Sequence, residues 1–161
     1  PYLYLPTGCV QTVPMADVAL KGNRIIEDKD LATRFIESTR YKNNKIAFDV
    51  TVEEKGVYGV DVHYVNGLGI VNPRRRTALR RLSVDGDHKG IFVFTQLSPV
   101  DWDNDPMREW QMMTGFTNPL KVGLDPGTHR FELRYYQPNP VYIDPFSNTV
   151  VADYVRIVRY E

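Results

Sequence analysis

Apolar and polar residues alternate along much of the chain with the period of two that half-buried β-strands show. In residues 46–52 (IAFDVTV), every second side chain is large and apolar, so one face of the segment can enter a core. Residues 58–64 (YGVDVHY) repeat this pattern after the turn residues 54–56. Together the two segments indicate a β-hairpin.

Further segments of this kind follow in the second half of the chain. Residues 82–84 lead into the turn formed by Asp85, Gly86 and Asp87, where glycine accepts a positive φ. The run 91–97 (IFVFTQL) that follows is apolar on both faces at first, as a strand in the centre of a sheet would be. Three more strands are expected, at 120–124, 131–135 and 150–160.

The first 40 residues show a weaker pattern. Residues 30–40 fit either a short helix or a strand, and we favour a strand. Tyr, Phe, Val and Ile are spread among 11 Gly and 11 Pro, which is the mixture expected of strands joined by turns. The alternating segments and the turns between most of them predict an all-β fold, an antiparallel β-sandwich of the jelly-roll kind.

Size, charge and cysteine content narrow the classes of function. A chain of 161 residues is long enough for one domain with one core. The 20 basic and 20 acidic side chains cancel, so no overall field favours nucleic acid, and no apolar stretch is long enough to span a membrane. Cys9 is the one cysteine, which excludes an internal disulfide and a four-cysteine metal site. We expect neither nucleic acid nor a membrane as a partner.

Two segments are too long to be simple turns. Residues 66–77 (NGLGIVNPRRRT) and 98–118 (SPVDWDNDPMREWQMMTGFTN) contain Trp, Arg, Asn, Asp and Met. Connections of this length in a compact domain are usually functional or disordered, and the aromatic residues of 98–118 argue against disorder. We therefore look for a binding site in these two segments.

Several short motifs follow one another in a characteristic order: residues 46–67, 82–86 (LSVDG), Trp110 and Phe116 ahead of 122–124, and the closing segment 152–157 (ADYVRI). This order resembles that of carbohydrate-binding modules of families 6 and 35, which are jelly-roll sandwiches of the galactose-binding type. Residues 77–86 and 115–124 are also similar to C-terminal β-domains of bacterial glycoside hydrolases. The resemblance covers residues 14–160, so it implies a linker or N-terminal extension at 1–13 and one sandwich domain at 14–161.

The resemblance also raises the question of a structural calcium ion, which members of these families hold with two glutamates near the start of the domain. Here the matching stretch is 14–17, where both glutamates are absent and Asp17 remains, together with Asp153 in the closing strand. Calcium takes about six to eight oxygen ligands, several of them from carboxylates. Asp17 and Asp153 alone would be a poor cage, so we expect no cofactor.

A sugar site needs an exposed aromatic ring for the C–H face of the sugar and planar polar side chains for its hydroxyls. Trp102, Trp110 and Phe116 lie in the longer connection, where each could be a sugar platform or could plug the end of the sandwich. The resemblance implies that Trp110 and Phe116 match the loop that supplies such platforms. It also implies that Asn148 matches a loop that supplies an amide.

Three more polar residues are candidates for the site. Asn66 and Asn118 could bind sugar hydroxyls, or could merely form Asx turns. Arg75 lies in the basic run 74–76, and arginine pairs bidentately with carboxylates and sulfates, so an acidic sugar is one hypothesis. The alternative is that these arginines pair with the acids in 101–105 or face water.

The sequence contains no motif typical of catalysis. His63, His88 and His129 lie in or beside separate expected strands and lack the spacing of metal ligands. Neither a Gly-x-Ser-x-Gly motif nor a phosphate-binding loop is present. We expect that this chain alone is not an enzyme.

These observations favour a non-catalytic carbohydrate-binding module appended to a glycan-degrading enzyme. The expected partners are an oligo- or polysaccharide and a catalytic domain of the same polypeptide, and the resemblance implies that the protein is secreted, to the periplasm or the extracellular space. The alternative is a structural accessory sandwich that packs on a catalytic domain without a ligand of its own. In that case the aromatic and Met-rich part of the longer connection would be a docking surface.

Overall fold

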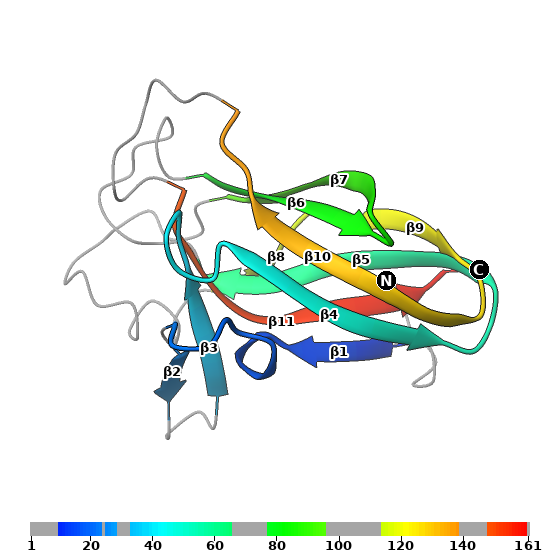
Figure 1. Cartoon of the computed structure of the whole chain (residues 1–161), viewed down its shortest axis with the longest axis horizontal. Helices are drawn as coiled ribbons and strands as arrows, with labels where there is room; N and C mark the ends of the chain where they lie inside the picture. The colour runs from blue at the N-terminus through cyan, green and yellow to red at the C-terminus, as the bar shows by residue number, and fades with distance from the viewer. Residues whose placement is uncertain are drawn as a thin grey trace.

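The structure is a computed structural model, and it describes residues 10–23, 25–28, 33–65, 77–95, 114–138 and 148–160. These residues form eleven β-strands and one turn of 3₁₀ helix, η2 (Met15–Asp17). They include no α-helix, and so no helix that could cross a membrane. Figure 1 shows the strands stacked in two layers, which confirms the antiparallel β-sandwich.

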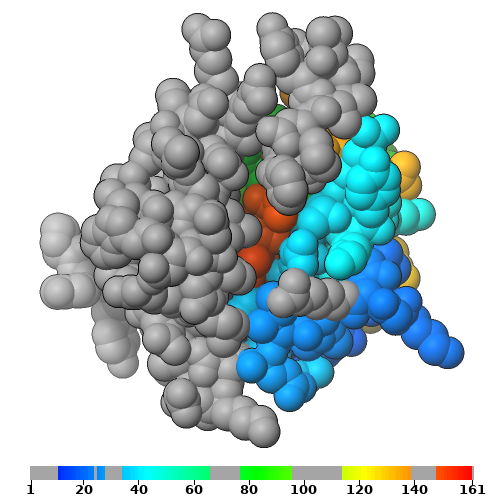
Figure 2. Space-filling model, turned by 90° about the vertical axis from the view of Figure 1, so that its left-hand side faces the viewer, coloured from blue at the N-terminus to red at the C-terminus, as the bar shows by residue number. Residues whose placement is uncertain are grey.

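The larger layer is a seven-stranded antiparallel sheet. Its main path runs through β2 (Ile25–Asp28), β3 (Thr33–Ser38), β11 (Val150–Arg159), β5 (Gly56–Val65) and β8 (Gly115–Phe116). Two more strands join the long central ones: β1 (Val10–Pro14) pairs with β11, and β9 (Leu120–Leu124) pairs with β5. At one end of the sandwich, the connection between β3 and β4, in cyan, lies exposed (Figure 2).

The smaller layer is a four-stranded antiparallel sheet. Its order is β4 (Lys45–Val52), β10 (Gly127–Tyr135), β6 (Ala78–Val84) and β7 (Asp87–Phe94). Along β4, Ile46, Phe48, Val50 and Val52 are buried, while Thr51 is exposed. The buried faces of the two sheets meet in one core, where each large apolar side chain contributes roughly 1.5–3 kcal/mol.

The hairpin expected from residues 46–64 is wrong. β4 pairs with β10 in the smaller sheet, whereas β5 pairs with β11 and β9 in the larger one. The chain crosses from one layer to the other at residues 53–55. Alternation shows which face of a strand is buried, but strands in both layers of a sandwich alternate in the same way. The pairing partner could not be derived from it.

The turn predicted at residues 85–87 is confirmed. β6 and β7 form a hairpin in which Val84 lies opposite Asp87, leaving Asp85 and Gly86 as a two-residue loop. Both loop residues have positive φ, 51° and 84°, as a type I′ turn requires. The strand preferred at residues 30–40 is also present, as β3.

The strand that covers most of the apolar run 91–97 is an edge strand, not a central one. β7 is the last strand of its sheet, and Ile91 and Val93 are only partly buried. Its Phe92 and Phe94 rings face inward and are fully buried in the core. At Gly90 the strand also approaches β9 so closely that an added Cβ would lie 2.7 Å from a methyl group of Leu120.

β1 lies largely within the stretch expected to be a linker or N-terminal extension. It pairs with β11 from Val10 opposite Val158 to Pro14 opposite Tyr154. Residues 10–13 therefore add a strand to the larger sheet.

Candidate functional site

The structure describes three of the seven residues predicted to bind carbohydrate: Phe116, Asn118 and Asn148. The other four lie outside the described residues, and their roles stay predictions: Asn66, Arg75, Trp102 and Trp110. The three described residues lie in three different settings, so each is considered separately.

Asn118 closes the free edge of β7. The Val93 N–H donates to Asn118 Oδ1 at 2.8 Å, and Asn118 Nδ2 donates to the Ile91 carbonyl at 3.1 Å. The amide thus pairs with the strand as a neighbouring strand would. This role also protects an edge that could otherwise pair with another chain.

Asn148 is buried, with 4% of its surface exposed, and its amide is used within the fold. Its Oδ1 accepts hydrogen bonds from the Leu79 N–H and from Arg80 Nη1, both at 2.7 Å. Its Nδ2 donates to the Tyr136 carbonyl at 2.7 Å and to Gln137 Oε1 at 3.0 Å. The amide of Asn148, just before β11, therefore joins β6 to the segment that follows β10.

Arg80 is the centre of this buried cluster. It is 3% exposed, and its guanidinium donates to Ser38 Oγ, the Ser38 carbonyl, the Leu79 carbonyl, Asn148 Oδ1 and the Asn148 carbonyl. Arginine has five N–H donors, and these five bonds use all of them. Burial lowers the pKa of Arg80 to about 10, so the side chain is still charged at neutral pH. The cluster holds the fold and leaves no donor for a ligand.

A different set of side chains gathers on the outer face of the larger sheet, away from the core. Side chains of directly opposed residues in neighbouring antiparallel strands lie on the same face. His63 of β5 is opposite Tyr154 of β11 on one side and Phe116 of β8 on the other. Two residues further along, Asp61 is opposite Arg156. We call these five residues the outer strip.

Three rings of the outer strip contact one another. The His63 ring stacks on Tyr154 with centroids 4.9 Å apart and planes 22° apart, and it lies at the same distance from Phe116. The Phe116 ring meets Tyr154 edge-on at 6.1 Å. Burial raises the pKa of the Tyr154 phenol, so it stays neutral. Phe116 itself is 39% exposed, which presents aromatic surface to solvent.

Arg156 links the rings to a carboxylate. Its Nε and Nη2 donate to the two oxygens of Asp61 at 2.9 and 2.6 Å, and this pairing raises the pKa of Arg156. The guanidinium carbon lies 3.7 Å from the centroid of the Phe116 ring, so the planar cation covers part of that ring. The third nitrogen, Nη1, has no hydrogen-bond partner among the described residues. Within the described part of the chain, it is a planar donor that the fold has not used, beside an exposed ring.

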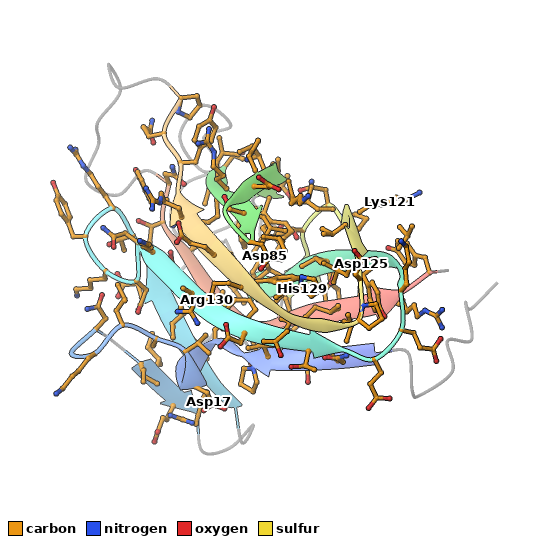
Figure 3. All side chains as sticks on the ribbon, turned by 45° about the vertical axis from the view of Figure 1, so that its right-hand side comes forward. Asp17, Asp85, Lys121, Asp125, His129 and Arg130 are labelled. Atoms are coloured by element: carbon orange, nitrogen blue, oxygen red, sulfur yellow. The ribbon has the colours of Figure 1, made fainter. Side chains whose placement is uncertain are left out.

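The two candidate calcium ligands have other contacts. Asp17, labelled in Figure 3, accepts a hydrogen bond from Arg34 Nη1 at 3.0 Å. Asp153 Oδ2 lies 3.3 Å from His63 Nδ1. In the part of the chain that the structure describes, no three His, Cys, Asp or Glu side chains gather as metal ligands would. These residues do not fit the oxygen-rich cage that calcium requires.

Sequence reasoning missed four members of the outer strip: Asp61, His63, Tyr154 and Arg156. All four occupy the outward positions of alternating strands, where polar residues are normally taken as solvated. The signal that could have found them is that complementary side chains lie opposite each other: Asp61 faces Arg156, and His63 faces Tyr154. It can be recognised only when the register between β5 and β11 is known. These strands are 90 or more residues apart in sequence at the strip, so the register was not available.

No protein-family model matches the sequence, and no curated protein matches it. Solved structures do match. A family 35 carbohydrate-binding module from Clostridium thermocellum matches with a TM-score of 0.60 and 16% identity over 92% of this chain and 98% of the module. A Podospora anserina β-(1,4)-mannanase, titled GH26-CBM35, matches with a TM-score of 0.57 and 10% identity over 95% of this chain and 28% of that one.

A larger enzyme also contains this fold. A Paenibacillus cycloisomaltooligosaccharide glucanotransferase, in complex with cycloisomaltoheptaose, matches with a TM-score of 0.64 and 19% identity. The match covers 96% of this chain, which spans about a fifth of the enzyme, 19% of its length. The family 35 module, in contrast, is matched over 98% of its own length. The protein thus has the sandwich fold of the family 35 carbohydrate-binding modules, as its sequence motifs implied.

Proposed function

We propose that this chain is a non-catalytic carbohydrate-binding module and that its sugar lies on the outer strip. The observation that carries the proposal is the exposed Phe116 ring beside the free Nη1 of Arg156. A sugar ring has a face of C–H groups and an edge of hydroxyls. An aromatic surface packs against the first, and a planar donor fixed in place binds the second.

The strip is well suited to hold its shape while it binds. Arg156 is fixed by two hydrogen bonds to Asp61 and by stacking on Phe116. The His63 ring packs between Phe116 and Tyr154. Side chains that are already ordered lose little conformational entropy when a ligand binds, which favours affinity.

The wider role follows from the same proposal. A module that holds a glycan raises the local concentration of an attached catalytic domain on that glycan, without chemistry of its own. We propose that the module serves a glycan-degrading enzyme on the same polypeptide and works outside the cytoplasm. The matches inside a glucanotransferase and a mannanase support this arrangement.

The test is calorimetry on the 161-residue chain with two sugar series suggested by these matches, isomalto-oligosaccharides and manno-oligosaccharides, after a glycan array to include other candidates. We expect at least one series to bind. Changing Phe116 to Ala is expected to weaken binding about tenfold, because the ring supplies the platform.

Tyr41 provides the matched control. It is the most exposed large aromatic residue described, at 73%, and its ring packs near Arg40 on the connection between β3 and β4, with no contact to the strip. The Tyr41→Ala variant is expected to bind as the parent does. If no glycan on the array binds the folded chain, the proposal is wrong and the accessory-domain alternative is favoured. If Phe116→Ala binds as tightly as the parent, the site lies elsewhere.

A further inference from the structure

A second aromatic ring lies on the same outer face, beyond the Arg156 end of the strip. The Tyr160 N–H donates to the Val57 carbonyl at 2.8 Å, so the residue continues the pairing of β11 with β5. Its ring then lies back over the strand at Gly59. A Cβ at Gly59 would collide with the phenol oxygen and Cζ of Tyr160. Only glycine at this position lets the ring rest on the backbone of β5.

The other side of the Tyr160 ring is open. The residue is 45% exposed, which makes it one of the most exposed large apolar side chains described. Lys121 of β9 lies opposite Gly59, and its Nζ is 6.0 Å from the centroid of the Tyr160 ring. Figure 3 shows Lys121 projecting from the edge of the molecule. No carboxylate pairs with Lys121 among the described residues, so its ammonium group can donate to a ligand.

This second platform is continuous with the outer strip. Gly59, Asp61 and His63 point to the same side of β5, and the four residue steps from Gly59 to His63 span roughly 13 Å. The Asp61–Arg156 pair lies between the two platforms. The face therefore presents a ring, a planar donor and a second ring in a row. A single sugar ring is too small to contact both ends.

The charges along this row cancel. Asp61 and Asp153 contribute two carboxylates, and Arg156 and Lys121 contribute two cations. The Arg156 charge is already neutralised by a bidentate pair with Asp61. An acidic sugar would have to compete with Asp61 for the guanidinium, whereas a neutral sugar needs only the free Nη1 and the Lys121 amine as donors. The row is thus matched to hydroxyl groups and not to carboxylates or sulfates.

We infer that Tyr160 on Gly59, with Lys121, forms a second sugar platform, so that the outer face binds a neutral oligosaccharide of at least two rings lying along β5. The inference rests on the proposed carbohydrate-binding function and adds the size and charge of the ligand. Glycine at position 59 would then be needed for binding as well as for packing, because any side chain there would displace the Tyr160 ring.

The test compares ligand length in the parent and in Tyr160→Ala. Calorimetry is performed with isomalto- and manno-oligosaccharides of one to six units and, for charge, with oligogalacturonides of the same lengths. In the parent, affinity for the neutral series is expected to rise about tenfold once the ligand is long enough to reach both platforms. In Tyr160→Ala this rise is lost, while the shortest ligands bind as they do to the parent. Gly59→Ala is expected to behave like Tyr160→Ala.

Tyr41→Ala again serves as the control, with thermal melting of every variant to confirm folding. A second readout is the amide NMR signal of Gly59, which is expected to shift when a long neutral ligand is added and not when a monosaccharide is added. If Tyr160→Ala keeps the parent's dependence on length, or if oligogalacturonides bind more tightly than neutral sugars, this inference is wrong while carbohydrate binding stands. If the parent binds no sugar at all, the proposed function fails and this inference fails with it.

Discussion

Arg80 and Arg156 both use a planar guanidinium to join segments far apart in the sequence, yet they serve different ends. Arg80 of β6 reaches across the sandwich to Ser38 of β3 and to Asn148 before β11, whereas Arg156 of β11 pairs with Asp61 on the neighbouring strand β5. Arg80 is 3% exposed, and all five of its donors bond to oxygens of the fold. Arg156 has a side chain 33% exposed, and among the described residues it donates to Asp61 alone, which leaves Nη1 without a partner there beside the exposed Phe116 ring. An arginine can bind a ligand only through N–H groups that are not already hydrogen-bonded within the fold, so its presence alone does not indicate a binding site.

The two side chains also differ in countercharge. The hydrogen-bond partners of Arg80 are carbonyls, an amide and a hydroxyl, and burial lowers its pKa. Arg156 faces a carboxylate, and its hydrogen bonds to Asp61 raise its pKa. A buried cation held by neutral groups depends on every one of those groups being in place. We therefore expect substitution by lysine to lower the stability of the fold at position 80 and to lower the affinity for sugar at position 156.

The largest effect is expected from Arg80→Lys. Lysine carries three donors on one atom and cannot reach the oxygens of both Ser38 and Asn148, so buried carbonyls lose their partners. We expect the free energy of unfolding to fall by about 3 kcal/mol in urea denaturation. Arg81→Lys, at the exposed neighbouring position, is the control and should change it by less than about 1 kcal/mol. A loss of less than about 1 kcal/mol in Arg80→Lys would contradict the structural role.

Arg156→Lys tests the other half of the comparison. The charge opposite Asp61 is kept, but the planar fork and its stacking on Phe116 are lost. We expect the free energy of unfolding to stay within about 1 kcal/mol of the parent and sugar affinity to drop about tenfold. Calorimetry and urea denaturation on the same preparation separate the two effects. A variant that binds as the parent does would remove Arg156 from the site.

His129 is a third cation, and its charge can be removed by raising the pH. His129 lies between two acceptors (Figure 3): its Nδ1 is 2.6 Å from Asp85 Oδ2, and its Nε2 is 2.7 Å from the Asp125 carbonyl. Only the protonated ring can donate to both. The hydrogen bond to the Asp125 carbonyl, and then that to Asp85, raise the pKa of His129 in the folded protein.

A raised folded pKa fixes the sign of the pH dependence. The stabilisation is complete below the unfolded pKa, about 6.5, and is lost as the pH rises through the folded value. We expect the free energy of unfolding to decrease by about 1 kcal/mol between about pH 6 and about pH 9. Replacing His129 with Gln should remove this decrease while sugar binding is unchanged. A parent whose stability does not fall over that range would show that the pair contributes nothing.

The smallest effect is expected from Asn118→Ala. The two hydrogen bonds to β7 are exposed, so their loss should lower the free energy of unfolding by about 0.5–1 kcal/mol. Hydrogen exchange provides the more specific measurement, because the Val93 amide would lose its acceptor and exchange faster. Sugar affinity is expected to stay at the parent value. If affinity fell instead, Asn118 would belong to the binding site, as the sequence suggested, and not only to the sheet edge.

The sequence alone determined those features that depend on neighbouring residues. Alternation in residues 46–52 identified the buried face of β4, and the Asp-Gly pair at 85–86 identified a two-residue hairpin turn, because both follow from local backbone geometry. The short motifs were enough to indicate the jelly-roll fold. These signals do not require knowledge of which strands are paired.

Which strands are neighbours, and what their outward side chains contact, depends on the packing of segments that are distant in sequence. This packing separated β4 from β5 into two sheets and moved β7 to an edge. It also placed Asn148 in the core and brought Asp61 and Arg156, 95 residues apart, together on one face. The physical reason is that side-chain period is a property of one strand, whereas register and layer are set by packing between distant segments. Burial can be derived from the first, but the candidate site depends on the second.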